Sequence, residues 1–416
     1  MSAHGEGASG PREALPWEVW ALLAGSFLVA AGFGVVAPAL PVFARSFGVG
    51  VTAAAAVVSA LPVFRLLFAP LSGRLVARVG ERTMYLGGLL VVAGSTAACA
   101  FATSYVQLLV FRGVGGIGST MFTVSAFSLI FRLAPEGRRG QVSGLFTGSF
   151  LLGGISGPAL GGALVAVDLR APFVVYAVAL VVATAVVGGL LAFSSGVGVR
   201  PTDPGVEPLT ISRALRRPTY RAALTSGLAT GWAVQGVRVG LVPLFVAVAL
   251  GREPLWAGIA LTVFAVGDGA MLLATSGLSD RRGRRPVVVA GLAMVAAGTA
   301  CLGLFPSLAV LLVASLVAGA GAGLLQPAQG AAVADLVGSR RSGGPALSGF
   351  QMASDVGAIV GPLAAGALAQ YVGFAAAFGV SGGVALVAML VWLTTTEPPA
   401  PAERGSPPGR EGTRAA

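Results

Sequence analysis

The chain has 416 residues, of which 55% are hydrophobic and only 10% are charged. Soluble globular proteins carry about 25% charged residues, so this composition argues strongly against a soluble enzyme and against a disordered chain. The net charge is +11, and all 27 basic residues are arginine. In so apolar a chain, we interpret this charge as belonging to loops at a membrane surface rather than to a nucleic-acid site. The composition predicts a polytopic membrane protein.

Twelve apolar segments are long enough to cross a bilayer, which requires about 20 residues of helix. Glycine and proline interrupt several of them, which helices inside a membrane bundle tolerate. The predicted spans lie near residues 17–44, 51–73, 84–102, 105–131, 141–167, 171–193, 219–249, 255–277, 287–305, 308–336, 346–370 and 373–395.

The distribution of arginine predicts the orientation of these spans. With both termini in the cytoplasm, 21 arginines fall in the tails and inner loops, and three fall in the outer loops. The remaining three, Arg65, Arg112 and Arg238, lie inside spans. Because positive residues favour the cytoplasmic side, we expect a multi-pass protein of a bacterial-type inner (plasma) membrane with both termini inside.

The two halves of the chain repeat each other. Leu40-Pro41-Val42-Phe43 recurs as Val242-Pro243-Leu244-Phe245, and Gly153-Gly154-Ile155-Ser156-Gly157-Pro158 recurs as Gly357-Ala358-Ile359-Val360-Gly361-Pro362. A polar, proline-rich stretch separates the halves. We therefore predict an all-α protein with a cytoplasmic N-terminal tail (1–16), an N-terminal six-helix bundle (17–193), a cytoplasmic linker (194–218), a C-terminal six-helix bundle (219–395) and a disordered cytoplasmic C-terminal tail (396–416).

Four segments carry recognisable motifs. In span 5, the spacing of small residues lets two helix backbones approach closely, and a proline bends the helix. The motifs are Gly153-x-x-x-Gly157-Pro158-x-x-Gly161-Gly162, the loop Gly73–Arg82 with its second copy Asp280–Arg285, Arg112-x-x-Gly115-Gly116-x-Gly118, and Gly34-x-x-x-Pro38-x-x-Pro41.

Over residues 17–395 these motifs resemble those of the major facilitator superfamily, and in particular its twelve-helix drug:proton antiporter branch. The resemblance implies two pseudo-symmetric halves that rock around a solute site near the midplane. It also implies gating roles for Gly73, Arg78, Gly80, Asp280, Arg281, Gly283, Gly153, Gly157, Pro158, Gly361 and Pro362.

The first loop departs from the family pattern at two positions. Ala77 stands where the family usually has an aspartate, and Glu81 stands where a basic residue is usual. Two interpretations stay open: Glu81 serves as a displaced acid, or the arginines of this loop merely anchor it at the membrane surface.

Ionisable residues inside spans cost about 2.5–3.5 kcal/mol at the bilayer centre, which makes them functional candidates. Arg65 and Asp355 lie at similar depths, in helices that the family fold places side by side. We predict an ion pair between them that closes the inner side when the protein faces outward. Asp268 has no evident partner, and a carboxylate in a low dielectric can exchange protons near neutral pH. We therefore expect Asp268, then Asp355, to carry protons, with transport without proton coupling as the third alternative. The family resemblance adds Arg112 to the proton-coupling residues.

Solute contact is predicted for polar and aromatic residues in the spans that line the cavity of this fold. The i, i+3, i+6 spacing of Trp232, Gln235 and Arg238 predicts that they share one helix face. Hydrogen bonding between helices is the alternative role for the two glutamines of span 10. The full set is Arg112, Trp232, Gln235, Arg238, Gln326, Gln329 and Phe33. Asp335 is expected to cap a loop or to pair with nearby Arg340 and Arg341.

These features predict a secondary transporter that exports a small amphipathic organic solute or drug in exchange for protons. The arginines in the spans favour an anionic or neutral solute. We expect no cofactor, no metal, no nucleic-acid partner and a monomer in the bilayer. An importer or uniporter of a sugar, amino acid or carboxylate is the alternative. A membrane sensor or intramembrane enzyme is a remote one, since the spans lack a Ser/His or paired-Asp constellation.

Overall fold

The computed structural model describes residues 15–133, 138–192, 211–275, 277–337 and 344–395, and this part of the chain is almost entirely helical. The first half contains α1 (Trp17–Val36), α2 (Leu40–Arg45), α3 (Val51–Val79), α4 (Glu81–Ala100), α5 (Tyr105–Leu133), α6 (Arg139–Val167) and α7 (Ala171–Ala192). The second half contains α8 (Ile211–Ala214), α9 (Pro218–Thr230), η1 (Gly231–Val237), α10 (Arg238–Leu244), η2 (Phe245–Ala249), α11 (Pro254–Ala274), α12 (Leu278–Arg282), α13 (Arg284–Leu304), α14 (Leu308–Val337), α15 (Gly344–Tyr371) and α16 (Phe374–Leu393).

Within the described residues, 12 helices are long and apolar enough to cross a membrane, which confirms the predicted number. The first predicted span, 17–44, is divided into α1 and α2 by a break at residues 37–39. Pro38 lies in this break, and its lack of a backbone N–H explains the interruption. The seventh span runs over 32 residues, Pro218–Ala249, and includes the π-helical segments η1 and η2.

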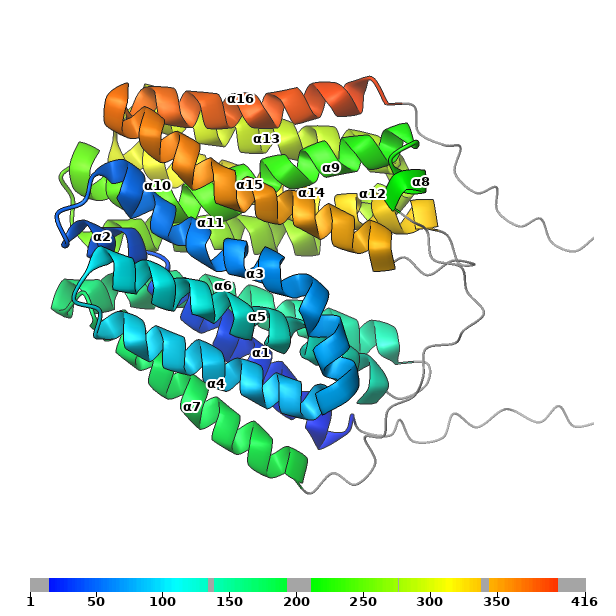
Figure 1. Ribbon diagram of the computed structural model, residues 1–416. Coiled ribbons are helices and arrows are strands. Elements are labelled where there is room, and N and C mark those ends of the chain that lie inside the picture. Colours follow the sequence, from blue (N-terminus) through cyan, green and yellow to red (C-terminus); the bar gives the residue numbers. More distant parts are fainter. Residues whose placement is uncertain (1–14, 134–137, 193–210, 276, 338–343, 396–416) are drawn as a thin grey trace, which may run out of the picture.

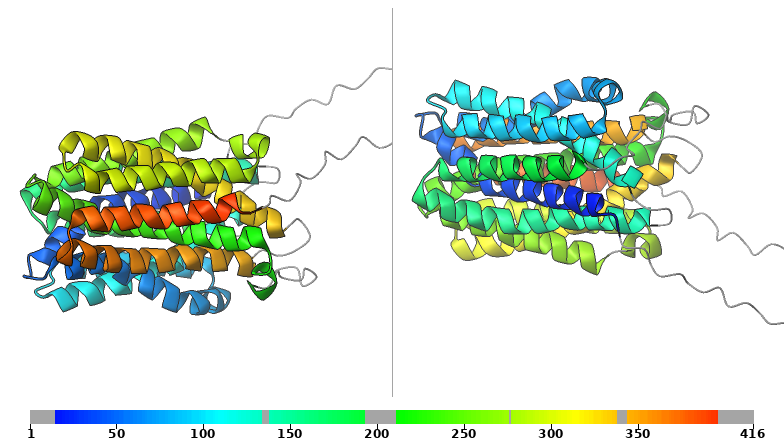
Figure 2. Two further views of the ribbon diagram at one scale, coloured as in Figure 1. Left: turned by 90° about the horizontal axis from the view of Figure 1, so that it is seen from above. Right: turned by 90° about the horizontal axis from the view of Figure 1, so that it is seen from below.

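The helices form two groups that correspond to the two halves of the sequence. Helices α1–α7 lie together in the lower part of Figure 1, and α8–α16 lie together in the upper part. The axes of the long helices are roughly aligned with one another in both views of Figure 2. The halves meet mainly where α3 packs against α15 and α6 against α11, and α10 also contacts α2 and α3. The predicted linker and C-terminal tail fall mainly in residues 193–210 and 396–416, which lie outside the described residues.

The backbone reproduces the sequence repeat. Gly80 ends α3 with φ 86°, and Gly283, 203 residues later, ends α12 with φ 88°. Gly48 and Gly251 have the same offset and also have positive φ. L-residues with a Cβ rarely adopt such angles, so glycine is required at these turns.

The glycine motifs of α6 and α15 allow close helix packing. A Cβ on Gly157 would lie 2.2 Å from the carbonyl oxygen of Ala31 on α1. In the other half, a Cβ on Gly357 would lie 2.1 Å from the carbonyl oxygen of Leu228 on α9. The two motifs thus bring α6 against α1 and α15 against the seventh span, as small-residue spacing predicts. The gating role of these glycines and of Pro158, Gly361 and Pro362 stays a prediction.

Candidate functional site

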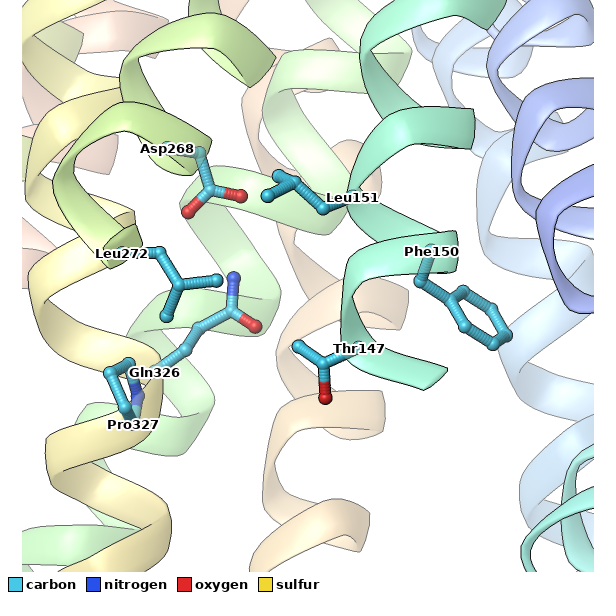
Figure 3. A pocket seen from close by; sticks show the side chains of 7 residues that line it. All are labelled: Thr147, Phe150, Leu151, Asp268, Leu272, Gln326 and Pro327. Carbon is cyan, nitrogen blue, oxygen red and sulfur yellow. The ribbon is translucent and has the colours of Figure 1, made fainter. Parts of the chain in front are cut away.

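A pocket of about 370 Å³ lies between the two halves of the molecule (Figure 3). Helix α6 of the first half forms one wall, and α11 and α14 of the second half form the other. Asp268 and Gln326 extend from the second half toward α6. The lining residues are Thr147, Phe150, Leu151, Asp268, Leu272, Gln326 and Pro327. Sequence reasoning found Asp268 and Gln326 of this set. It missed the other five lining residues, Thr147, Phe150, Leu151, Leu272 and Pro327.

The two halves are closed against each other at the end opposite the arginine-rich loops. There, the backbone N–H of Thr52 on α3 donates to Oε1 of Gln370 on α15 at 3.0 Å. Further along the same helices, Ser59 Oγ donates to the carbonyl oxygen of Ile359 at 2.7 Å. The pocket-lining residues Thr147 and Gln326 are exposed and lie nearer the arginine-rich ends of their helices. The pocket therefore opens toward the side predicted to be cytoplasmic.

Asp268 has a buried arginine as its charged neighbour. Arg238 is 5% exposed, and its Cζ lies 3.7 Å from the ring centroid of Phe264 on α11. Asp268 follows Phe264 by one helical turn and interacts electrostatically with Arg238. Arg238 also donates from Nη1 to Ser315 Oγ at 3.4 Å. The sequence made no partner of Asp268 evident, and the structure places Arg238 of the seventh span as its charged neighbour.

The predicted common face of Trp232, Gln235 and Arg238 is also corrected. Trp232 Nε1 donates to Ser381 Oγ on α16 at 3.1 Å, and Gln235 Nε2 lies 3.5 Å from Ser354 Oγ on α15. Arg238 instead reaches α11 and α14. The spacing argument assumed 3.6 residues per turn, whereas η1 has the wider i→i+5 turn of a π-helix. The three side chains therefore contact different helices.

Arg112 and Phe33 come together within the first half. The Arg112 guanidinium lies 5.6 Å from the centroid of the Phe33 ring on α1, a cation–π geometry. Arg112 is 7% exposed and Phe33 is 41% exposed. Within the described residues, Nε of Arg112 has no hydrogen-bond partner, and the same is true of Nε of Arg238. In the described part of each half there is thus a buried guanidinium whose Nε donor lacks a hydrogen-bond partner.

The two glutamines of α14 differ in environment. Gln326 is exposed and lines the pocket. Gln329 is buried, and its Nε2 lies 3.4 Å from Thr230 Oγ1 on α9. The alternative role, a hydrogen bond between helices, therefore describes Gln329 in this structure, and solute contact remains the prediction for Gln326.

The predicted contact between Arg65 and Asp355 is confirmed. Arg65 Nη2 lies 3.8 Å from Asp355 Oδ1, and Gln351 Nε2 lies 3.3 Å from the same oxygen. The pair is formed while the opposite ends of α3 and α15 are also in contact. The role expected of this pair, closing the inner side when the protein faces outward, stays a prediction.

We expect Arg65→Ala and Asp355→Ala each to lower transport several-fold, because either change leaves one charge uncompensated between the halves. The exchanged pair, Arg65→Asp with Asp355→Arg, should recover much of the loss. Initial transport rates in vesicles, normalised to the amount of protein, would measure this. A double variant that transports no better than the single variants would contradict a paired role.

The remaining predicted gating residues lie at the arginine-rich turns. Arg78 is exposed near the end of α3, and Gly80 and Gly283 form the turns described above. Residues Gly73, Asp280 and Arg281 belong to helices α3 and α12, but their side chains lie outside the described part of the chain.

Comparison with known proteins decides the family. A sequence profile described as "Major Facilitator Superfamily" matches residues 22–257 and 223–415. The chain belongs to this superfamily. It is therefore a membrane transporter rather than an enzyme. The 12 candidate spans among the described residues and the bacterial relatives indicate a multi-pass inner-membrane protein.

Several curated relatives of this superfamily member are resistance proteins. It is 29% identical over 381 residues to the "Chloramphenicol resistance protein" of Streptomyces lividans, covering 89% of this chain and 95% of that one. It is 26% identical over 156 residues to the "Quinolone resistance protein NorA" of Staphylococcus aureus, covering 38% and 40%.

Solved structures share the fold at low sequence identity. A bacterial homologue of the human lysosomal transporter Spinster, crystallised in an inward-facing and occupied conformation, has a TM-score of 0.75 and 15% identity, covering 91% of this chain and 96% of that one. A POT family transporter in complex with 5-aminolevulinic acid has a TM-score of 0.76 and 13% identity over the same shares. These similarities support the two-half architecture of the superfamily.

Proposed function

We propose that this superfamily member exports a small, partly apolar organic compound from the cytoplasm in exchange for protons. The observation that carries the proposal is the pocket between the halves, in which Asp268 is the ionisable side chain among the described lining residues. Residues of both halves line the pocket, so a rocking motion of one half against the other would open it alternately to each side of the membrane. The resistance proteins among the relatives support export as the direction.

The roles follow from the contacts. Asp268 would carry the proton, since it lies in the pocket and beside the buried guanidinium of Arg238. Gln326 and the apolar wall of Phe150 and Leu151 would hold the solute. Arg112 and Arg238 each retain an unsatisfied Nε donor within the described residues, which favours a solute that offers hydrogen-bond acceptors. Asp355, paired with Arg65, would stabilise the contact between the two halves.

The orientation of the chain is part of the proposal. Both termini would lie in the cytoplasm, because the arginine-rich turns lie at one end of the bundle and positive loops favour that side. The protein would act as a monomer, since each chain supplies both halves of the pocket. Trp232 and Gln235 would contribute to transport indirectly, by holding the seventh span against α16 and α15.

The Asp268→Asn variant tests the proposed proton coupling. We expect an efflux-deficient bacterial host that expresses the protein to gain resistance to a compound in a broad panel, and a protonophore to remove that resistance. Asp268→Asn should lose both the resistance and the pH dependence of transport, because the amide cannot exchange a proton. Asp168→Asn, which changes an acid in the turn between α6 and α7, is the matched control.

Two outcomes would contradict this proposal. Transport by Asp268→Asn with unchanged pH dependence would remove Asp268 as the proton carrier. Accumulation of the compound inside cells, instead of depletion, would reverse the direction to import.

A further inference from the structure

A second pocket, of about 440 Å³, lies within the second half, between the start of α9 and the end of α16. Its lining residues are Pro218, Arg221, Val391, Thr394 and Thr395. The start of α9 and the end of α16 lie at the same end of the bundle as α8 and α12, which is the arginine-rich end (Figure 1). The pocket is therefore separate from the one between the halves, which α6, α11 and α14 line.

Positive charge is concentrated beside this second pocket. Residues 211–221 contain four arginines and no acid, and all four arginines are exposed. They are Arg213, Arg216, Arg217 and Arg221. Within the described part of the chain, no carboxylate forms an ion pair with Arg216, Arg217 or Arg221. A cluster of basic residues next to the cytoplasmic end of a span attracts anionic lipid, so the pocket has a charge that suits an anionic group.

The two threonines of the pocket can accept hydrogen bonds, whereas their own hydrogens are already donated. Thr394 Oγ1 donates to the carbonyl oxygen of Val391 at 2.9 Å, and Thr395 Oγ1 donates to the same oxygen at 2.8 Å. A hydroxyl that donates its hydrogen keeps its acceptor lone pairs, and a guanidinium can only donate. The pocket thus combines the donors of Arg221 with two accepting oxygens. A ligand that fits both carries a negative charge and has O–H donors of its own.

The apolar face of α16 that leads to the pocket favours a lipid as the source of this anion. Leu390 and Val387 precede Thr394 by four and seven residues, so the three side chains lie along one helix face. Leu390 is 56% exposed and Val387 is 61% exposed, in a helix that is apolar enough to span the membrane. The pocket therefore lies where a lipid-facing surface meets the polar end of the helix, in the region that phospholipid headgroups occupy.

We propose that this pocket binds an anionic phospholipid that has hydroxyls on its headgroup, of which phosphatidylglycerol is the simple example. Arg221 donates to the phosphate, Arg216 and Arg217 add positive charge, and the oxygens of Thr394 and Thr395 accept from the glycerol hydroxyls. A phosphatidylethanolamine headgroup also offers donors, but its ammonium would bring a positive charge close to the arginines. The bound lipid joins the start of the seventh span to α16. The inference does not depend on the solute or on proton coupling.

Lipid binding to the purified full-length chain tests the charge of the site. Native mass spectrometry in detergent would give the dissociation constant of the first bound lipid, with phosphatidylglycerol as the probe. Arg221→Gln should weaken binding about fivefold, the effect of one basic residue near an anionic lipid. Arg282→Gln removes an exposed arginine of α12 at the same end of the bundle, and as the matched control it should leave binding unchanged.

Phosphatidylmethanol separates recognition of the headgroup from attraction by charge alone. It has the phosphodiester and the charge of phosphatidylglycerol but lacks the headgroup hydroxyls. The wild type should bind phosphatidylglycerol about two- to tenfold more tightly, the range for a net hydrogen bond. Thr394→Val with Thr395→Val keeps the branched side chains but removes the accepting oxygens, so it should abolish this preference. Arg221→Gln should weaken the binding of both lipids and keep the preference.

The soluble headgroup shows whether the acyl chains contribute to binding. Glycerophosphoglycerol has the phosphate and the hydroxyls without the chains. Because the chains would bury apolar surface along α16, we expect it to displace the lipid only at concentrations at least about tenfold higher. Displacement at equal concentrations would overturn the assignment to a lipid and point to a soluble phosphodiester.

Three further results would overturn the inference. These are unchanged binding by Arg221→Gln, an equal loss in Arg282→Gln, and a wild type that binds phosphatidylmethanol as tightly as phosphatidylglycerol. Unfolding temperatures of the same purified variants identify any variant that has lost its fold. If Arg221→Gln does so, Arg217→Gln should still weaken binding more than Arg282→Gln, and the double threonine variant tests the headgroup preference independently.

Discussion

Gly157→Ala is expected to remove most of the folded, transport-competent protein from the membrane. The new Cβ would lie 2.2 Å from the carbonyl oxygen of Ala31 and 2.8 Å from Cα of Gly34. Both are backbone atoms of α1, so the clash cannot be relieved by a change of side-chain rotamer. Forcing extra atoms into a packed interior costs about 1–3 kcal/mol, and more where backbone must move. The yield of monodisperse protein and its unfolding temperature in detergent would measure the effect.

Gly154→Ala provides a matched control on the same helix. A Cβ on Gly154 would meet no other atom within 4 Å. Alanine is favoured over glycine in a helix by up to about 1 kcal/mol, so this variant should be at least as stable as the wild type. Equal unfolding temperatures for Gly154→Ala and Gly157→Ala would show that the close contact of α6 with α1 does not limit stability.

Arg238→Met is expected to lower transport at least tenfold in protein that still folds. Methionine keeps an unbranched side chain next to Phe264 but removes the positive charge. Asp268, which is half-buried, then loses its charged neighbour, and the ionised form of a carboxylate that is partly removed from water is destabilised without a compensating charge. A tenfold loss corresponds to about 1.4 kcal/mol of transition-state free energy. Initial transport rates across a pH series, in vesicles with matched protein content, would measure it.

Two further variants separate the possible causes of such a loss. Phe264→Leu removes the ring beneath the guanidinium and retains the charge, so we expect an intermediate effect. Arg252→Met removes an exposed arginine from the loop before α11 and should leave transport unchanged. Wild-type transport by Arg238→Met would show that Asp268 works without this neighbour.

Most of the fold could be predicted from the sequence because membrane spans are defined by length and apolarity, which need no long-range information. The contact between Arg65 and Asp355 was predictable for a related reason. Both lie in long helices, so counting residues from the helix ends gave their depth, and the family fold supplied the pairing of α3 with α15.

The candidate site was less predictable because it depends on helix geometry that the apolar pattern does not encode. The π-helical turn η1 separates Trp232 from Gln235 and Arg238, whereas the spacing had suggested one face. Thr147, Phe150 and Leu151 are ordinary residues for a membrane helix, so nothing in the sequence distinguishes them.

The two arginine-rich turns share one backbone shape but are followed by opposite charges. Glu81 pairs with Arg132 after the first turn, and Arg284 pairs with Asp335 after the second. This combination limits how the two halves could be recombined. Gly80 and Gly283 adopt nearly the same φ, so a chimaeric chain that exchanged the segments around them would keep its shape at both turns. Like charges would then repel at both turns, however, because an arginine at position 81 would face Arg132, and a glutamate at position 284 would face Asp335. The two turns therefore have interchangeable backbones but incompatible charges. If the two halves arose from one duplicated segment, both partners of an ion pair would have had to change together for the pair to be kept.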